Sequence, residues 1–273
     1  MIVNLTRHWK WLLILIVVQF GCKSYNVRPN LTAEKRIELA RLMFNNKDYV
    51  EAKTQYKILT LNNPGLRFID EAQFFLAECH FNIKEYILAA DEYSRLTRLY
   101  SKSPWVDDAY FKIALCNYKL SPKPALDQKY TKLAVLHFAA FIEDFPNSEI
   151  VPEAERLLKR CRTKLAEKEF KAGDLYRKLN INHAALVYFD SVLETYYDTK
   201  YAKDALFLRG ESLYELDRKV EADKAFKEFI AKYPQSKLVS KAKSRIKEIT
   251  SEVNKVRKAN GVSPSAKQEQ KKQ

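Results

Sequence analysis

The sequence predicts an all-α solenoid: five copies of a helix pair, followed by a C-terminal capping helix. Three observations predict this fold class. The 273 residues include only five glycines, and Leu, Ala, Lys and Glu dominate, which is typical of helices and unlike a sheet-rich or phosphate-loop protein. A small residue recurs at a fixed distance before an alanine–aromatic pair. An alanine also recurs nine residues after the aromatic or Asn residue that closes each copy.

The fifth copy shows the pattern most completely. Gly210 is followed twelve residues later by Ala222, and then by Phe226 and Pro234. Small residues let two antiparallel helices approach, the aromatic ring fills the angle between them, and proline ends the second helix. These positions match the second part of the tetratricopeptide repeat (TPR) motif. The close approach predicts that Gly210→Leu overpacks the interface and that Gly210→Ala is nearly neutral or mildly stabilising.

The same spacing occurs in four earlier copies. Their alanine–aromatic pairs are Ala52–Tyr56, Ala89–Tyr93, Ala134–Phe138 and Ala185–Phe189, and their small residues are Ala40, Ala77, Ala114 and Gly173. The third copy has twenty residues in place of twelve between small residue and alanine, which predicts an eight-residue insertion. We therefore predict TPR repeats at about 32–64, 68–101, 104–146, 165–197 and 200–234. A capping helix at 236–258 completes the predicted solenoid (32–258), because the last repeat's apolar face has no other neighbour.

Residue types at the boundaries support this division. Thr32 is the expected N-cap of the first helix, and Pro104 suits the first helical position of repeat three. In repeat three the prolines of 121–124 predict a loop, after which the second helix resumes near Lys129. The connection to repeat four is fourteen residues longer than the others, which predicts an added helix over roughly 150–164.

Residues 1–21 are predicted to be a lipoprotein-type signal peptide. Two basic residues precede the ten-residue apolar run Trp11–Phe20, which is too short to cross a bilayer as a helix. The cysteine of Gly21-Cys22 follows a small residue, as at the cleavage site of bacterial lipoproteins, so acylation of Cys22 is expected to anchor the mature chain. Residues 22–31 would form a tether. The alternative is an ordinary signal peptide with an incidental cysteine.

Three cysteines remain after Cys22. Cys79 and Cys116 hold equivalent positions in adjacent repeats, whose first helices lie about 8–10 Å apart, an unfavourable separation for a disulfide. We therefore predict that these two cysteines and Cys161 are buried free thiols.

The charge of the chain is concentrated near its C-terminus. The formal net charge is +14, and the segment 237–273 contains eleven basic and three acidic residues. Residues 259–273 are polar and of low complexity, which predicts a disordered basic tail. This region is either a solvated surface or a contact for an acidic partner or anionic headgroups. Nucleic-acid binding is not expected, because an exported protein meets little nucleic acid.

No catalytic pattern occurs in the sequence. His80, His137 and His183 lack metal-site spacing, and there is neither a G-x-S-x-G motif nor a Walker loop. We predict a protein that is not an enzyme and that binds no cofactor and no metal.

The candidate binding residues lie on the first helix of each repeat, which lines the concave wall of a TPR solenoid. Positions three before and four after the small residue share one helix face. In the first three repeats these positions supply the aromatic residues of a predicted partner or substrate groove: Phe44, Phe74, Phe81, Phe111 and Tyr118. Acidic residues edge it at Glu34, Glu71 and Asp108. Two alternatives stay open: the aromatic rings pack between neighbouring first helices, and the acids complement the helix dipole.

Two segments resemble the BamD family, lipoproteins of the outer-membrane β-barrel assembly machine. One is the Pro-rich insert followed by Leu126-Asp127-Gln128. The other is the long third joint, with Cys161-Arg162, the run Leu165-Ala166-Glu167-Lys168-Glu169, Gly173 and Tyr176. The resemblance extends from Cys22 to about Ile249.

The resemblance implies a non-enzymatic adaptor that is lipid-anchored in the outer membrane and faces the periplasm. Its C-terminal repeats would dock to the periplasmic domains of a BamA-like barrel subunit, and its N-terminal repeats would recognise nascent β-barrel proteins. An alternative is another exported TPR adaptor of the Tol–Pal-associated type, but no heptad run for that family's coiled coil precedes Thr32. A hydrolase subunit or carbohydrate-binding lipoprotein has no supporting residues.

Overall fold

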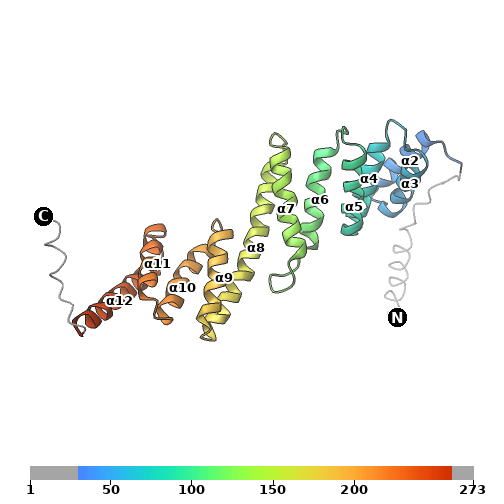
Figure 1. Cartoon of the computed structure of the whole chain (residues 1–273). Helices are drawn as coiled ribbons and strands as arrows, with labels where there is room; N and C mark the ends of the chain where they lie inside the picture. Colours follow the sequence, from blue (N-terminus) through green and yellow to red (C-terminus); the bar gives the residue numbers. More distant parts are fainter. Residues whose placement is uncertain (1–29, 260–273) are drawn as a thin grey trace, which may run out of the picture.

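The computed structural model describes residues 30–259, with side chains described up to residue 255. The described residues form eleven helices and no strand, arranged as an elongated stack of helix pairs (Figure 1). The predicted fold class, an all-α TPR solenoid, is confirmed. The predicted signal peptide, the acylated Cys22, most of the tether and nearly all of the basic tail lie outside the described residues.

Each repeat consists of an A helix followed by a B helix. The A helices of repeats one to five are α2 (Ala33–Asn45), α4 (Ile69–Asn82), α6 (Val106–Leu120), α8 (Val151–Lys178) and α10 (Tyr201–Glu215). The B helices are α3 (Tyr49–Asn62), α5 (Tyr86–Leu99), α7 (Lys129–Asp144), α9 (Asn182–Thr195) and α11 (Lys219–Lys232). The capping helix is α12 (Val239–Ala259).

The core repeats with the sequence. In every repeat the B-helix alanine is fully buried, and so is the aromatic ring four residues later, which fills the angle between the A and B helices. At Gly173 and Gly210 the A and B helices of repeats four and five are in close contact. An added Cβ would lie 2.8 Å from Phe189 Cε1 at Gly173 and 2.7 Å from Phe226 Cε1 at Gly210. Because both rings are fully buried, even a methyl group would require the ring to move, which argues against the expected tolerance of Gly210→Ala.

The structure tests the residues predicted to begin two helices, Thr32 and Pro104. The predicted N-cap is confirmed: Thr32 Oγ1 accepts a hydrogen bond from the backbone N–H of Lys35, 3.4 Å away. Pro104, in contrast, does not occupy the first position of a helix. Helix α6 begins at Val106, so that Pro104 lies in the preceding turn and Trp105 takes the N-cap position.

The insertion in repeat three is an ordered loop built around Gln128. The buried Gln128 side chain donates to the carbonyl oxygens of Lys123 (2.8 Å) and Leu126 (3.0 Å), and its Oε1 accepts from Thr131 Oγ1 at 2.6 Å. Two lysines of helix α8 also bind the loop. Lys164 Nζ lies 2.7 Å from Ser121 Oγ, and a second lysine donates to the Leu126 carbonyl.

The predicted added helix at 150–164 is not a separate element. It is continuous with the A helix of repeat four, and together they form the 28-residue α8, about 42 Å long. The physical reason is local: no glycine or proline lies between Pro152 and Gly173, so nothing interrupts the helix. In Figure 1, α8 stands between a stack of α2–α7 and a stack of α9–α12.

The three thiols are buried and unpaired, as predicted. Burial raises the pKa of Cys79 and of Cys116 to about 12, so both stay protonated and unreactive near neutral pH. The capping helix begins at Val239, three residues later than predicted. It buries Ala242 and Ile249 against repeat five, while its exposed positions are polar or charged. None of the helices in the described part of the chain is both long enough and apolar enough to span a membrane.

Candidate protein-binding surface

Phe74 and Phe111, from the position three before the small residue, lie in the core of their own repeats. Phe74 is 5% exposed and Phe111 is 7% exposed. The Phe111 ring lies 5.8 Å from the ring of Phe138 and 5.7 Å from that of Phe141, both on helix α7. The Phe74 ring likewise lies 5.7 Å from the ring of Tyr93 on helix α5, so both rings pack against the B helix of their repeat.

Phe44, Phe81 and Tyr118, from the position four after the small residue, are half-buried between successive A helices. Phe44 lies edge-on to Phe75 of α4, with 5.0 Å between ring centroids. Lys112 Nζ of α6 lies 4.9 Å from the centroid of Phe81, and Lys164 Nζ of α8 lies 6.0 Å from that of Tyr118. The structure thus distributes these rings over three joints between A helices and gives the last two a cationic neighbour.

A groove does exist in the N-terminal repeats, at the N-terminal ends of the A helices. Its volume is about 570 Å³, and it is lined by Glu34, Ile37, Glu38, Arg41, Arg67, Phe68, Asp70, Glu71, Pro104 and Trp105. None of the five predicted aromatic residues lines it directly. Phe74 lies behind it, because the half-buried indole of Trp105 stacks on the Phe74 ring at 4.7 Å and 20°.

Trp105 and Phe68, which both immediately precede an A helix, were not among the predicted residues. The available signal was an aromatic residue at the end of the connection between two repeats. The helix-face pattern could not find them, since that pattern applies only to residues within a helix.

The rim of this N-terminal groove is acidic. It carries four carboxylates and two arginines, and Arg41 binds Glu71 with two hydrogen bonds of 2.7 and 2.6 Å. The hydrogen bonds to Glu71 raise the pKa of Arg41. Asp70 accepts a hydrogen bond from Ser103 Oγ at 2.7 Å. The remaining two acids, Glu34 and Glu38, are exposed at the rim, where they would favour a cationic or neutral ligand over an anionic one.

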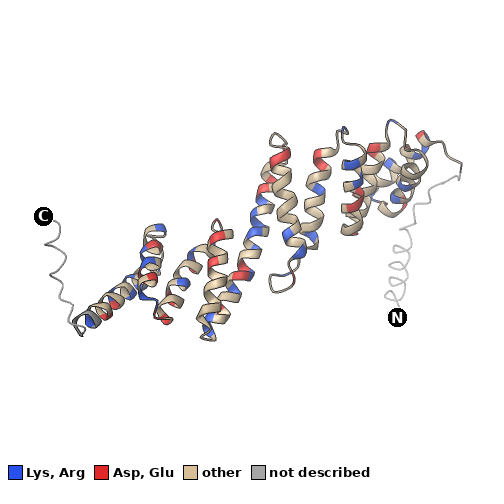
Figure 2. Cartoon of the chain, in the orientation of Figure 1, with Lys and Arg blue, Asp and Glu red and all other residues tan. Residues whose placement is uncertain are grey.

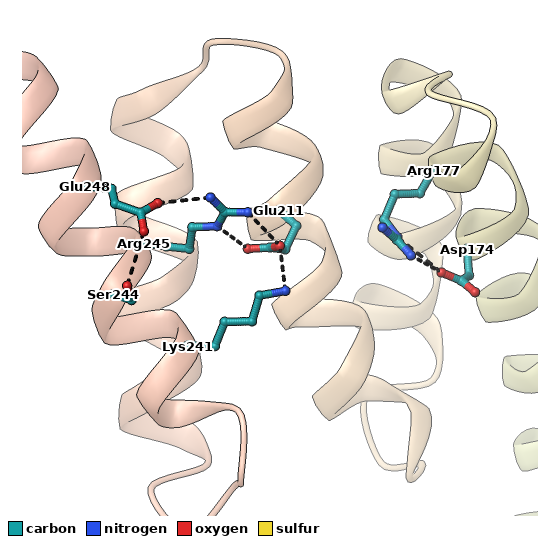
Figure 3. Close-up of polar contacts among 7 residues, drawn as sticks. All are labelled: Asp174, Arg177, Glu211, Lys241, Ser244, Arg245 and Glu248. Atoms are coloured by element: carbon teal, nitrogen blue, oxygen red, sulfur yellow. Dashed lines mark hydrogen bonds and ion pairs between the residues drawn. The ribbon is translucent and has the colours of Figure 1, made fainter.

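A buried carboxylate joins the capping helix to repeat five. Glu211 of α10 is 9% exposed; Arg245 Nε lies 2.9 Å from its Oε1 and Lys241 Nζ lies 3.0 Å from its Oε2 (Figure 3). Burial alone would raise the pKa of Glu211, but the hydrogen bonds from Arg245 and Lys241 outweigh it and hold the pKa below its usual value. Arg245 also binds Glu248 at 3.0 Å. These contacts fix α12 on the solenoid.

The equivalent acid in repeat four, Asp174, forms ion pairs with basic residues of its own helix. Asp174 Oδ1 accepts from Arg177 Nη2 at 2.8 Å (Figure 3). Asp174 Oδ2 lies 2.7 Å from Lys178 Nζ. In contrast, Glu78 of repeat two binds Lys112 of the next A helix at 2.5 Å. Glu78 and Glu211 each bind a basic residue of the next helix in the inner row, α6 and α12 respectively. In repeat four the equivalent Asp174 instead binds basic residues of its own helix, α8.

A protein-family model matches most of the chain. The model of the family described as "Outer membrane lipoprotein" (YfiO) matches residues 34–225, which is from α2 into α11. The chain belongs to this family. The YfiO match includes the stack α2–α7, the ordered insert, the long α8, and α9, α10 and the start of α11, as well as the N-terminal groove and Glu211.

Solved structures similar to this YfiO-family chain include TPR proteins. The TPR2AB domain of yeast Sti1, in its pHSP90 complex, is 16% identical, with a TM-score of 0.40; 84% of this chain and 87% of that chain are covered. A tetratricopeptide repeat protein from Parabacteroides merdae is 15% identical, with a TM-score of 0.35 and coverage of 80% and 73%. The comparison with curated proteins finds no match.

The chemistry available on this YfiO-family chain is that of binding. The described residues contain no group of three or more His, Cys, Asp or Glu side chains that could hold a metal ion. The N-terminal groove offers the aromatic side chains of Phe68 and Trp105 among mostly charged lining residues, and the C-terminal stack offers a basic capping helix. Such surfaces suit protein partners, in agreement with an adaptor role for this outer membrane lipoprotein family.

Proposed function

We propose that this protein is a non-enzymatic adaptor of the outer-membrane β-barrel assembly machinery. It is anchored by lipid at Cys22, binds nascent β-barrel proteins in the N-terminal groove and docks to a BamA-like barrel subunit through α10–α12. Membership of the outer membrane lipoprotein family and the TPR fold support the proposal. The observation that carries it is the N-terminal groove, where Trp105 presents an aromatic surface stacked on the core ring of Phe74.

The groove suits an extended segment that carries an aromatic side chain. An incoming ring would stack on the open face or edge of Trp105, and aromatic pairs add about 0.5–1.5 kcal/mol to the burial of apolar area. Phe68 and Ile37 supply further apolar contact. The exposed carboxylates Glu34 and Glu38 would repel a free terminal carboxylate. An aromatic residue inside the segment would therefore dock more deeply than one at its very end.

Trp105→Ala is expected to weaken binding of a peptide copied from the aromatic C-terminal strand of a β-barrel protein by about tenfold, because the stacking surface is lost. Trp105→Phe should retain most of the affinity. The measurement is fluorescence anisotropy with the full-length protein, together with a thermal melt. The predicted sites Phe74 and Phe111 are poor probes of binding, because removing a buried ring also costs about 3–5 kcal/mol of stability. Equal affinity of the wild type and Trp105→Ala would place the peptide elsewhere.

Cys22→Ser is expected to abolish the membrane anchor, because the thiol that would carry the lipid is lost. The variant should appear in the soluble periplasmic fraction or accumulate uncleaved, while Lys23→Ala, which keeps the cysteine, should stay with the membrane. Fractionation of the envelope and the mass of the N-terminal peptide test this. A mature wild-type chain that is soluble, with an unmodified Cys22, would contradict the anchor.

A further inference from the structure

One repeat lacks the neighbour that its position in the stack leads us to expect. Two residues after the small residue of the A helix, repeats two, three and five have Cys79, Cys116 and Ser212, all fully buried. Repeat one has Leu42, which is 53% exposed, and among the described residues no helix precedes α2. Repeat four has Leu175, which is 57% exposed although three repeats precede it. In this respect repeat four resembles the first repeat of a stack.

The continuous helix α8 explains the difference. Cys79 and Cys116 each lie in a core cluster with residues of the preceding B helix, α3 and α5 respectively. Against the next B helix, α7, the corresponding place is taken by Cys161, in the first half of α8. Leu175 lies fourteen residues later on the same helix, about 21 Å further along its axis. The packing position next to Leu175 is therefore beyond the end of α7.

These residues belong to one stripe along α8, which is apolar except at Lys168. Because residues seven apart lie on the same helix face, Ala154, Cys161, Lys168 and Leu175 are aligned. The first two are fully buried against repeat three. The ordered insert covers the middle, where Lys168 Nζ donates to the Leu126 carbonyl at 2.8 Å. Beyond the insert the stripe is exposed.

The uncovered part of the stripe, which we call the α8 patch, consists of Leu175, Leu179 and Ile181. Leu179 is 58% exposed, and Ile181, at the start of α9, is 49% exposed. Leu126, on the surface of the insert, is a further exposed aliphatic residue on the loop that ends the covered part. Leu175, Leu179 and Ile181 are close together in the chain and lie at a break between two stacks, and such a group of exposed aliphatic side chains marks an interaction surface.

The charge around the α8 patch is positive. The segment 164–179 has five basic and three acidic residues, and Figure 2 shows Lys and Arg along α8. Lys171 and Lys178, four residues before and three after Leu175, have exposed side chains even though they also bind Glu167 and Asp174. A ligand with carboxylates beside its apolar side chains would complement this surface.

We infer that the α8 patch is a docking site for an amphipathic α-helix with acidic flanks, supplied by a partner protein. In repeats two and three the equivalent position of the A helix is covered by a B helix, so the shape left open beyond α7 is that of a helix. Apolar residues at i, i+4 and i+7 of the partner would cover Leu175 and Leu179. This inference concerns a face other than the N-terminal groove and does not depend on the proposed function.

The test uses the full-length protein and two synthetic 18-residue helix-forming peptides, both with leucines at i, i+4, i+7 and i+11. One peptide has glutamates at the flanking positions and the other has lysines. We expect the glutamate peptide to bind and the lysine peptide to bind at least about fivefold more weakly. Leu175→Asp combined with Leu179→Asp should weaken binding of the glutamate peptide by about tenfold or more. The matched control Leu42→Asp should leave its affinity within about twofold, since Leu42 is exposed to a similar degree but lies on α2, outside the α8 patch.

A thermal melt accompanies each binding curve. Because Leu175 and Leu179 are both exposed, we expect the double aspartate variant to melt at the wild-type temperature. If the aspartates unfold the protein, the double variant Leu175→Ala with Leu179→Ala is used in its place. Absence of binding by the glutamate peptide, or binding that the leucine substitutions leave unchanged, would overturn the inference. So would leucine-dependent binding to vesicles containing anionic lipid without peptide binding, which would identify the α8 patch as a membrane contact.

Discussion

Gly210→Ala is expected to destabilise the C-terminal repeats by about 1–2 kcal/mol, and Gly210→Leu by about 3 kcal/mol. A Cβ at Gly210 would lie 2.7 Å from Cε1 and 3.0 Å from Cζ of Phe226, whereas favourable carbon–carbon contacts are about 3.5–4.0 Å long. The Phe226 ring is fully buried in the cluster that joins α10, α11 and α12, so it cannot turn aside without displacing its neighbours. The clash therefore outweighs the higher helix propensity of alanine.

Gly65 provides the matched control. It lies in the connection after α3, and an added Cβ would have no heavy atom within 4 Å, so Gly65→Ala should leave stability unchanged. A second variant, Phe226→Leu combined with Gly210→Ala, should show less than the sum of the two single effects, because the smaller side chain removes the clash.

Chemical unfolding combined with hydrogen exchange is the appropriate measurement. A solenoid is stabilised by each repeat and its interface with the next, so loss of protection should be largest in α10–α12 and small in α2–α5. A Gly210→Ala variant that unfolds at the same denaturant concentration as the wild type would show that the ring of Phe226 moves freely.

The parts of the fold that repeat in the sequence could be predicted, because each position has the same neighbours in every copy. The buried thiols are an example: Cys79 and Cys116 share one position and one environment. The helix-pair core follows from the same logic. The pattern also indicated that the connection before repeat four is too long, since this requires only counting residues.

The relation between the two stacks could not be predicted from the repeat pattern. The pattern assigned 150–164 and the A helix of repeat four to separate elements. The first segment packs against repeat three, and the second pairs with the B helix of repeat four, α9. Whether two such elements are joined by a turn or fused depends on how far one stack is displaced along the other. The absence of glycine and proline between Pro152 and Gly173 was the local signal for fusion.

The candidate site was predicted on the correct class of helix but with incomplete residues. A helix face defined by spacing includes both Phe74, which is in the core, and Phe81, which is half-buried. The angle between the A and B helices decides which of them is covered, and spacing within one helix contains no information about that angle. Trp105 precedes its helix and was outside the pattern altogether.

The C-terminal stack is the proposed docking end. Glu211 fixes α12 on α10 through Arg245 and Lys241, so the basic side chains of α12 are held on a rigid surface. Truncation after Tyr197 removes α10–α12 and is expected to abolish binding to the barrel subunit. The repeats α2–α7 keep their own core clusters and should remain folded. Deletion of residues 260–273 alone, the matched control, leaves α12 in place and should retain binding.

Co-purification of the barrel subunit from detergent-solubilised envelopes tests the proposed function most directly. The tagged full-length chain and the chain lacking 260–273 should each recover the barrel-assembly subunit, identified by mass spectrometry, and the chain truncated after Tyr197 should recover none. Far-UV circular dichroism of the truncated chain verifies that its remaining repeats are helical. Absence of the barrel subunit from the full-length preparation would contradict the proposed function, and its retention by the truncated chain would contradict docking through α10–α12.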